Sequence, residues 1–107
     1  MTEELQFLYR LEPVRLGMLV EPTPEEGEVV GKHFAYLERL TAEGTVFLAG
    51  RTLHTDETSF GLVVFRAPDE EAARGIMEAD PAVRAGIMRA ELFPYRVALS
   101  AAPWPAR

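Results

Sequence analysis

The order in which extended and helical patterns alternate is the feature that most restricts the fold of this chain. Apolar residues at every second position predict a strand over residues 5–12, and residues 24–43 carry the spacing of one long amphipathic helix. Two β-rich runs, a second helix and a last alternating segment follow. This β-α-β-β-α-β order predicts an α+β, ferredoxin-like fold, in which a four-stranded antiparallel sheet carries both helices on one face.

Local signals set the ends of the first helix. Thr23 precedes Pro24, which is suited to the first position of a helix. Glu26 follows three residues after Thr23, which is the pattern of a capping box. Gly44 is well suited to the left-handed conformation that closes a helix. Residues 13–23 lie before this start, and their prolines and glycine predict irregular chain. The run RLGMLV within them could extend the strand or form a helical turn.

The remaining elements follow from composition and turn residues. The predicted elements are strands at 45–53 and 59–67, a helix at 68–81 with one more turn at 82–86, and a strand at 88–100. Pro94 lies inside the last strand and predicts an edge strand or a bulge, because proline cannot donate to a neighbouring strand. Phe93, Tyr95, Val97 and Leu99 share one face of that strand.

The run GLVVF, residues 61–65, is apolar at consecutive positions. Both faces of that strand therefore favour burial, while the helices can cover only one face of the sheet. A second copy of the chain is the simplest cover for the other face. We predict a homodimer packed sheet to sheet, and further assembly of dimers stays open.

Length and composition fit one domain. The chain has 107 residues, of which 48% are hydrophobic and 26% are charged, a balance that supports one packed core. We expect a single domain over residues 1–107, with its core at about 5–99. The tail 100–107 is proline-rich and expected to be loosely held, with Trp104 as its anchor.

Charge and residue usage exclude several classes of function. A net charge of -6 disfavours phosphate backbones and anionic lipid, so neither nucleic acid nor membrane is an expected partner. The chain has no cysteine, which removes disulfides, thiolate metal sites and cysteine nucleophiles. No secretory leader or bilayer-spanning run is recognisable, and a cytoplasmic location is the default expectation.

His33 is the residue that departs most from a plain structural pattern. Val29, Val30, Leu37 and Leu40 lie within roughly 60° of it on the first helix, so a titratable ring stands in the middle of the apolar stripe. One interpretation is a core histidine that hydrogen-bonds a carbonyl group. The other is a functional imidazole, which requires a partner.

Asp80 is the candidate partner. An aspartate before Pro81 is also a good helix N-cap, and that role alone would explain it. The two roles are compatible, because one carboxylate oxygen can accept the backbone donor while the other faces an imidazole. In the predicted fold the helices run side by side, so the end of the second can approach the first. Such a pair would fix the tautomer of His33 and leave its other nitrogen free to move protons.

Two arginines are candidates for binding an anionic substrate. Arg51 follows Gly50 at the end of a predicted strand, where the glycine permits close approach of a ligand and the guanidinium can hold a carboxylate. Arg15 lies on irregular chain, where binding groups often occur. Each could instead be a surface ion-pair partner in an acidic protein.

Other chemistries have little support in the sequence. A metal site would need His54, in the polar HTDET segment, to reach His33, and we expect none. Ser59 and Ser100 lack a nucleophile motif, and no glycine-rich phosphate loop supports a nucleotide cofactor. We therefore expect no cofactor.

Several short motifs, in this order, resemble the YCII-related (YciI-like) domain family. They are KHFAYLERL, the pair EG at 43–44, LAGRT at 48–52, FGLVVF, EEAARGIMEADP and MRAELFPYRVAL. The resemblance covers roughly residues 5–99 and implies a dimeric ferredoxin-like fold of the α+β barrel type. It also implies a catalytic histidine and aspartate, matched here by His33 and Asp80. Residues 13–29 form a longer segment than the brief loop of minimal members, so no substrate-facing residue carries over there.

The resulting hypothesis is a small dimeric enzyme that performs proton transfer, isomerisation or elimination on a small metabolite. His33 and Asp80 would be catalytic, and an anionic substrate follows if Arg51 or Arg15 binds it. The alternative is a non-catalytic module of the same fold that binds a small molecule or serves assembly, because one fold hosts many functions.

Overall fold

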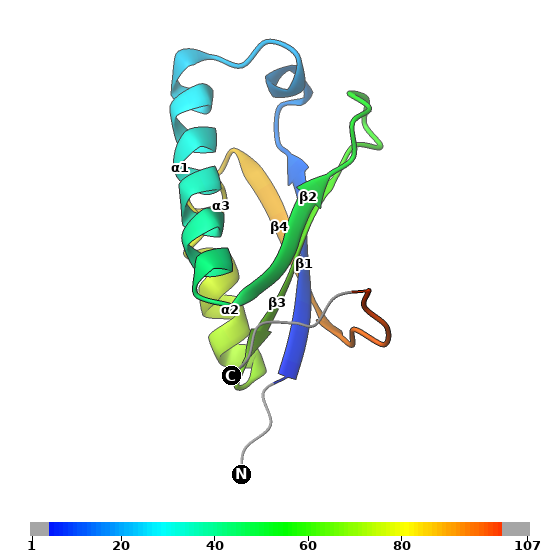
Figure 1. Cartoon of the computed structure of the whole chain (residues 1–107). Helices are drawn as coiled ribbons and strands as arrows, with labels where there is room; N and C mark the ends of the chain where they lie inside the picture. Colours follow the sequence, from blue (N-terminus) through cyan, green and yellow to red (C-terminus); the bar gives the residue numbers. More distant parts are fainter. Residues whose placement is uncertain (1–4, 102–107) are drawn as a thin grey trace.

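The computed structural model describes residues 5–101, and their helices cover one face of a twisted sheet (Figure 1). The elements in chain order are β1 (Leu5–Pro13), the 3₁₀ helix η1 (Leu16–Leu19), α1 (Pro24–Ala42), β2 (Val46–Arg51), β3 (Gly61–Ala67), α2 (Glu70–Glu78), α3 (Pro81–Arg84) and β4 (Met88–Tyr95). Trp104 and the rest of the predicted tail from residue 102 onward lie outside the described residues.

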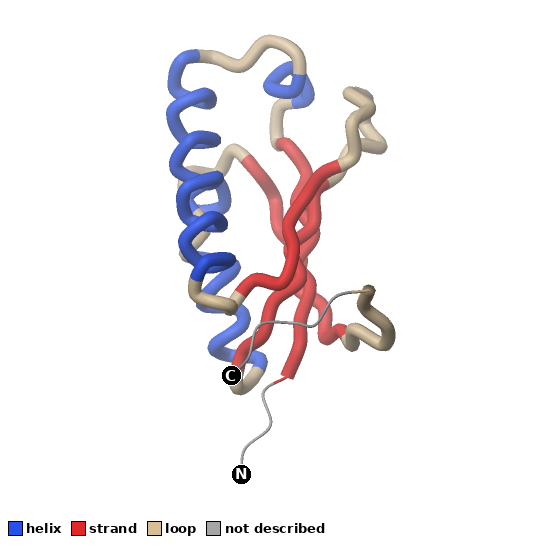
Figure 2. Tube along the Cα trace, in the orientation of Figure 1, coloured by secondary structure: helices blue, strands red, loops and turns tan. Residues whose placement is uncertain are grey.

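The four strands form one sheet in the order β2-β3-β1-β4, and every neighbouring pair is antiparallel. This order places the first and third strands in the centre, as in the ferredoxin-like fold. The predicted architecture is therefore confirmed: an α+β protein with a four-stranded antiparallel sheet. Figure 2 shows the helices on one side of the strands only.

The ends of α1 form as the sequence predicts. The Glu26 backbone N–H donates to Thr23 Oγ1 at 3.1 Å, and the Thr23 backbone N–H donates to Glu26 Oε1 at 2.9 Å. Both halves of the capping box are therefore present, and they satisfy two N–H groups at the start of the helix. At the other end Gly44 has a φ of 82°, a conformation that favours glycine.

The segment left open by the sequence contains one short helical turn. Residues Leu16–Leu19 form η1, and Met18 is buried. Arg15 joins this segment to α1, because its Nε donates to Glu26 Oε2 at 2.9 Å and its Nη2 lies 2.5 Å from Glu26 Oε1. The prolines and glycine prevent a regular strand here, while the ion pair holds the irregular chain in place.

Strand alternation divides β1 between the two faces of the sheet. Phe7, Tyr9 and Leu11 are buried against the helices. The intervening residues therefore point to the opposite face. The register places Leu48, Val64, Leu8 and Phe93 side by side on that outer face, one from each strand. An apolar row thus crosses the sheet on the side without helices.

Pro94 lies on β4, which is an edge strand, one of the two outcomes that the sequence predicts. The strand is shorter than expected: it ends at Tyr95, opposite Gln6 near the start of β1, so later residues have no strand partner. The Val97 N–H instead donates to the Gln6 side chain at 2.7 Å. Val97 and Leu99 therefore do not continue the predicted strand face.

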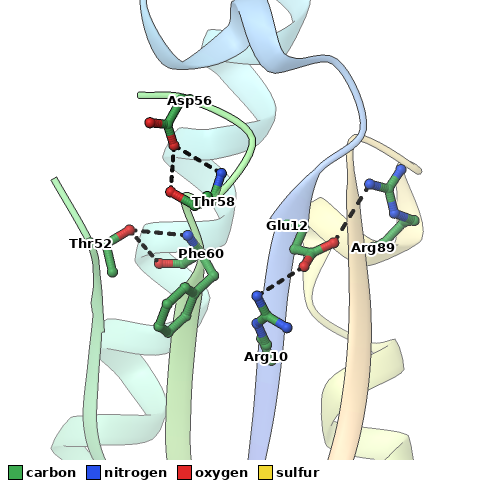
Figure 3. A network of polar contacts seen from close by, with 7 residues as sticks. All are labelled: Arg10, Glu12, Thr52, Asp56, Thr58, Phe60 and Arg89. Atoms are coloured by element: carbon green, nitrogen blue, oxygen red, sulfur yellow. Dashed lines mark hydrogen bonds and ion pairs between the residues drawn. The ribbon is translucent and has the colours of Figure 1, made fainter. Parts of the chain in front are cut away.

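Polar contacts cover the end of the outer face nearest the β2–β3 connection. Glu12 lies between Arg10 of β1, at 3.1 Å, and Arg89 of β4, at 3.7 Å (Figure 3). Across the sheet, Thr52 hydrogen-bonds Phe60 and closes the base of the connection.

Within residues 5–101 no helix is long and apolar enough to cross a bilayer.

Candidate functional site

His33 lies on the face of α1 that turns toward the sheet. Its neighbours one turn further on, Leu37 and Leu40, are buried, whereas the His33 side chain retains 14% exposure. The ring is therefore held by the core on one side and reaches a cavity on the other. This position follows from the helical spacing that the sequence displays.

Asp80 begins α3 and is fully buried. Its Oδ1 accepts the Ala82 backbone N–H at 3.0 Å, so the aspartate is the N-cap of that helix. The same carboxylate lies against His33: Nδ1 is 2.7 Å from Oδ1 and 2.9 Å from Oδ2. One side chain thus fills both roles that the sequence allowed, and the contact joins α1 to α3 across 47 residues of chain.

A third side chain completes the surroundings of Asp80. The Tyr9 hydroxyl, from the centre of β1, donates to Asp80 Oδ2 at 2.7 Å and is buried. Burial, followed by the charge and hydrogen bond of Asp80, raises the pKa of Tyr9 well above its ordinary value. Tyr9 therefore stays a neutral donor.

The contact with Asp80 fixes the chemistry available to His33. A carboxylate can only accept, so a neutral His33 carries its proton on Nδ1. In the described part of the chain, no hydrogen-bond partner occupies Nε2. The arrangement supplies a lone pair on Nε2 and a buried anion behind the ring, which would stabilise the imidazolium formed when Nε2 takes up a proton.

A cavity of about 800 Å³ opens beside His33, between α1, the β2–β3 end of the sheet and η1. Its walls are mostly aliphatic and aromatic, and they include Met18, Phe34, Leu37 and Phe60. This size and character suit a small organic molecule. The wall of α1 also carries Glu38 and Thr41.

Arg51 and Gly50 both line this cavity together with His33. Arg51 pairs with Gly61 in the ladder, and Gly61 with Leu11, so Arg51 belongs to the helix-facing side of the sheet. Its only hydrogen bond in the described chain is a 3.4 Å contact with the carbonyl oxygen of Thr52. The guanidinium therefore has no carboxylate partner among these residues.

Arg15 is placed differently. Its guanidinium is bound by Glu26 and by the Glu21 carbonyl oxygen at 3.1 Å, and Arg15 is not among the residues that line the cavity. The structure thus brings His33, Asp80, Gly50 and Arg51 to one region and leaves Arg15 outside it. In this position Arg15 orders the segment before α1.

Sequence reasoning did not single out Tyr9 or Tyr36. Tyr36 is half-buried and donates to the Ile76 carbonyl oxygen at 2.7 Å, which ties α1 to α2. Its pKa is raised by burial and by the nearby charge of Asp80. The available signal was a phenol in an otherwise apolar stripe, since a buried hydroxyl needs a partner.

No group of three or more histidine, aspartate and glutamate side chains suited to a metal ion occurs in residues 5–101. His54 is exposed in the β2–β3 connection. The absence of a metal and of a cofactor stays a prediction.

A ferredoxin-like α+β protein with a histidine–aspartate contact beside an apolar cavity is the class that this fold and site define. The chain belongs to the YCII-related domain family, which it matches over residues 12–96. The resemblance seen in the sequence motifs is therefore confirmed. No curated protein sequence matches the chain.

Solved structures of other proteins share the fold, and two of them cover most of this chain. The 5-chloro-2-hydroxyhydroquinone dehydrochlorinase TftG of Burkholderia phenoliruptrix, in complex with 2,5-dihydroxybenzoquinone, gives a TM-score of 0.65 at 23% identity, covering 86% of this chain and 94% of its own. An uncharacterized protein of Thermotoga maritima gives a TM-score of 0.55 at 10% identity, covering 88% of this chain and 100% of its own. At these identities the likeness establishes the fold.

Proposed function

We propose that this protein is an enzyme that performs cofactor-independent acid–base chemistry on a small molecule, with His33 as the proton carrier and Asp80 as its fixed partner. One observation carries the proposal: His33 Nδ1 lies 2.7 Å from a fully buried carboxylate, while the same ring lines a cavity. A histidine that served packing alone would not need a buried anion behind it and a ligand-sized space in front of it.

The proposed cycle uses one proton. Neutral His33, with Nδ1–H donated to Asp80, accepts a proton from a substrate C–H or O–H at Nε2, and the substrate keeps the bonding electron pair. The imidazolium is stabilised by Asp80. His33 then returns the proton to another atom of the same molecule, which gives an isomer, or to a departing group, which gives an elimination product. The enzyme ends with the protonation it had at the start.

The cavity supports a substrate with an apolar body and one acidic group. Its walls are mostly apolar, and Arg51 supplies a cation without a carboxylate partner in the described chain. TftG, which shares the fold, is a dehydrochlorinase, so the fold accommodates chemistry of the proposed class. The substrate class proposed for this chain is inferred from the lining of its own cavity and not from TftG.

Proton exchange tests the catalytic proposal without knowledge of the natural substrate. A panel of aryl-substituted carbon acids bearing a carboxylate would be incubated in D₂O, and exchange of their C–H groups followed by ¹H NMR. Exchange by the wild-type protein should fall on the order of 100-fold in His33→Asn, because general-base catalysis contributes at least that much. Equal exchange in wild type and variant would contradict the proposal.

Anion recognition has its own test. Thermal shifts with the same carboxylates should be smaller in Arg51→Gln than in wild type, and unchanged in Arg84→Gln, which alters an exposed arginine of α3 outside the cavity. Equal shifts in both variants would remove Arg51 from the site. Carboxylate binding with no proton exchange in the wild type would favour the non-catalytic binding module.

We also propose a homodimer that covers the outer face of the sheet. The apolar row of Leu48, Val64, Leu8 and Phe93 supports it. Val64 is already buried in the single chain, and a second sheet could bury the exposed members of the row while the helices of each copy remain outside. Phe93 is 37% exposed and Leu48 is 48% exposed in the single chain. Leu48 of this row also lines the cavity, so the proposed interface borders the cavity at β2.

A further inference from the structure

We propose that Tyr9 is a positioning residue that sets the orientation and the acceptor strength of Asp80, and through Asp80 the proton on His33. The inference rests on the proposed function of His33 and adds a group that acts on it from the sheet. Three donors surround the buried carboxylate of Asp80.

The donors divide the Asp80 oxygens between them. Ala82 N–H binds Oδ1 at 3.0 Å, the Tyr9 hydroxyl binds Oδ2 at 2.7 Å, and His33 Nδ1 approaches both oxygens at 2.7 and 2.9 Å. With one fixed donor on each oxygen, the carboxylate plane cannot turn without breaking a hydrogen bond. The ring of His33 thus meets an acceptor whose direction is set by β1 and α3.

The position of the Tyr9 hydroxyl is itself well determined. Tyr9 lies on a central strand, paired with β3 on one side and β4 on the other. Its ring packs edge-to-face on Phe65 with centroids 5.6 Å apart, and it has no exposed surface. Burial, followed by the charge and hydrogen bond of Asp80, raises the pKa of Tyr9, so the phenol keeps its proton and remains a donor at neutral pH.

A shared carboxylate is a weaker acceptor for each of its donors than an unshared one. The hydrogen bond from the Tyr9 hydroxyl therefore weakens Asp80 as an acceptor for His33. His33 then keeps its own proton on Nδ1, while Asp80 still stabilises the imidazolium. Without this hydroxyl the carboxylate would turn more freely and would pull harder on the Nδ1 proton.

The chain offers a matched control. Tyr36 is also a tyrosine close to Asp80, and its hydroxyl also makes one 2.7 Å hydrogen bond, but to the Ile76 carbonyl oxygen. Tyr9→Phe and Tyr36→Phe each remove one hydroxyl and keep the ring. A general loss of packing or stability should appear in both variants, whereas an effect transmitted through Asp80 should appear only in the first.

The experiment uses ¹⁵N-labelled protein and the proton-exchange assay. In Tyr9→Phe the Nδ1–H resonance of His33 should move downfield, and exchange should fall on the order of tenfold in kcat with KM unchanged, because a misplaced catalytic group affects the reacting geometry rather than binding. In Tyr36→Phe both quantities should match the wild type. An unchanged Nδ1–H resonance and unchanged kcat in a folded Tyr9→Phe would overturn the proposal.

A second measurement keeps the test independent of how well Tyr9→Phe folds. The hydroxyl proton of Tyr9 should move upfield in Asp80→Asn relative to wild type, because an amide oxygen is a weaker acceptor than a carboxylate. An unmoved resonance would contradict the assigned contact. The two proposals can fail separately. If His33 is not the proton carrier, His33→Asn should keep the exchange activity of the wild type. If only the Tyr9 role is wrong, His33→Asn should still lose that activity.

Discussion

Asp80 joins three parts of the molecule through one carboxylate. It caps α3, meets His33 of α1 and accepts the hydroxyl of Tyr9 from β1. Burying a charge without partners costs several kcal/mol, and three donors offset that cost here. The residue is therefore as important to stability as to the proposed chemistry.

Asp80→Ala should lower the free energy of unfolding by about 3 kcal/mol, because it removes a helix cap and leaves the buried Tyr9 hydroxyl without an acceptor. Asp69 is the matched control, since it caps α2 by accepting the Ala72 N–H at 2.8 Å from an exposed position. Asp69→Ala should cost only about 1 kcal/mol. Urea unfolding of both variants measures the difference, and equal losses would show that Asp80 acts as a cap alone.

The carboxyl group of Glu26 makes the free energy of unfolding depend on pH. Hydrogen bonding to Arg15, then to the Thr23 N–H, lowers the pKa of Glu26 from 4.5 to about 2. Because the folded pKa lies below the unfolded one, this stabilisation is present above pH 4.5 and is lost as the pH falls toward 2.

Unfolding curves of wild type and Glu26→Gln should therefore differ at neutral pH and converge below about pH 2. Glu28→Gln serves as the control, because Glu28 is exposed and lies 3.8 Å from Lys32 on the surface of α1. A wild-type advantage over Glu26→Gln that persists unchanged at pH 2 would show that the carboxylate charge is not its source.

At the scale of the element, α1 positions the site because both of its ends are fixed. The capping box and Arg15 hold the start, and Gly44 turns the chain into β2. His33 lies near the middle of this helix, and the rotation of α1 about its axis decides whether the ring meets Asp80. Leu37 and Leu40 set that rotation by burying the same face.

Two glycine variants test the ends against the interior. Gly44→Ala should destabilise the protein by about 1–2 kcal/mol, since the φ of 82° is unfavourable for alanine. Gly27→Ala should stabilise it by about 0.5–1 kcal/mol, because an added methyl group meets nothing within 4 Å and alanine favours the helix. Thermal unfolding measures whether the two stability changes have opposite signs. A loss of stability in both variants would contradict the different roles assigned to Gly44 and Gly27.

At the scale of the whole molecule, the two faces of the sheet carry the two proposed functions. Its helix-facing side carries Tyr9 and Arg51 of the proposed site, and its outer side carries the apolar row proposed to join two copies. Antiparallel register assigns alternate residues of β1 to these two sides. Phe93 belongs to the apolar row and does not line the cavity, so a change at Phe93 tests assembly apart from the proposed chemistry.

Phe93→Glu should weaken the proposed dimer at least tenfold in Kd, because it places a charge in the apolar row of the interface. Phe93 is already 37% exposed, so the cost to folding should be small. Leu53→Glu, at a position 81% exposed in the β2–β3 connection, is the control and should leave association unchanged. Sedimentation velocity at micromolar protein measures both, and a wild-type protein that is monomeric there would reject the dimer.

Much of the fold could be predicted because its signals are local. Thr23, Glu26 and Gly44 set the bounds of α1 through contacts within a few residues. Pro94, which lacks a backbone donor, predicted an edge strand or a bulge, and the strand is an edge strand. The end of β4 could not be predicted, because it depends on where the pairing with β1 ends. The structure of residues 13–23 depends on the distant pairing of Arg15 with Glu26 in the same way.

By itself the sequence determined the order of the elements, the faces of β1 and α1 and the two residues, His33 and Asp80, that could form a pair. Only the tertiary structure decided that Tyr9 binds the same carboxylate, that Arg51 shares the cavity of His33 and that Arg15 does not. Periodicity and capping are properties of neighbours along the chain. The meeting of β1, α1 and α3 at one buried carboxylate is a property of packing, which no short stretch of residues contains.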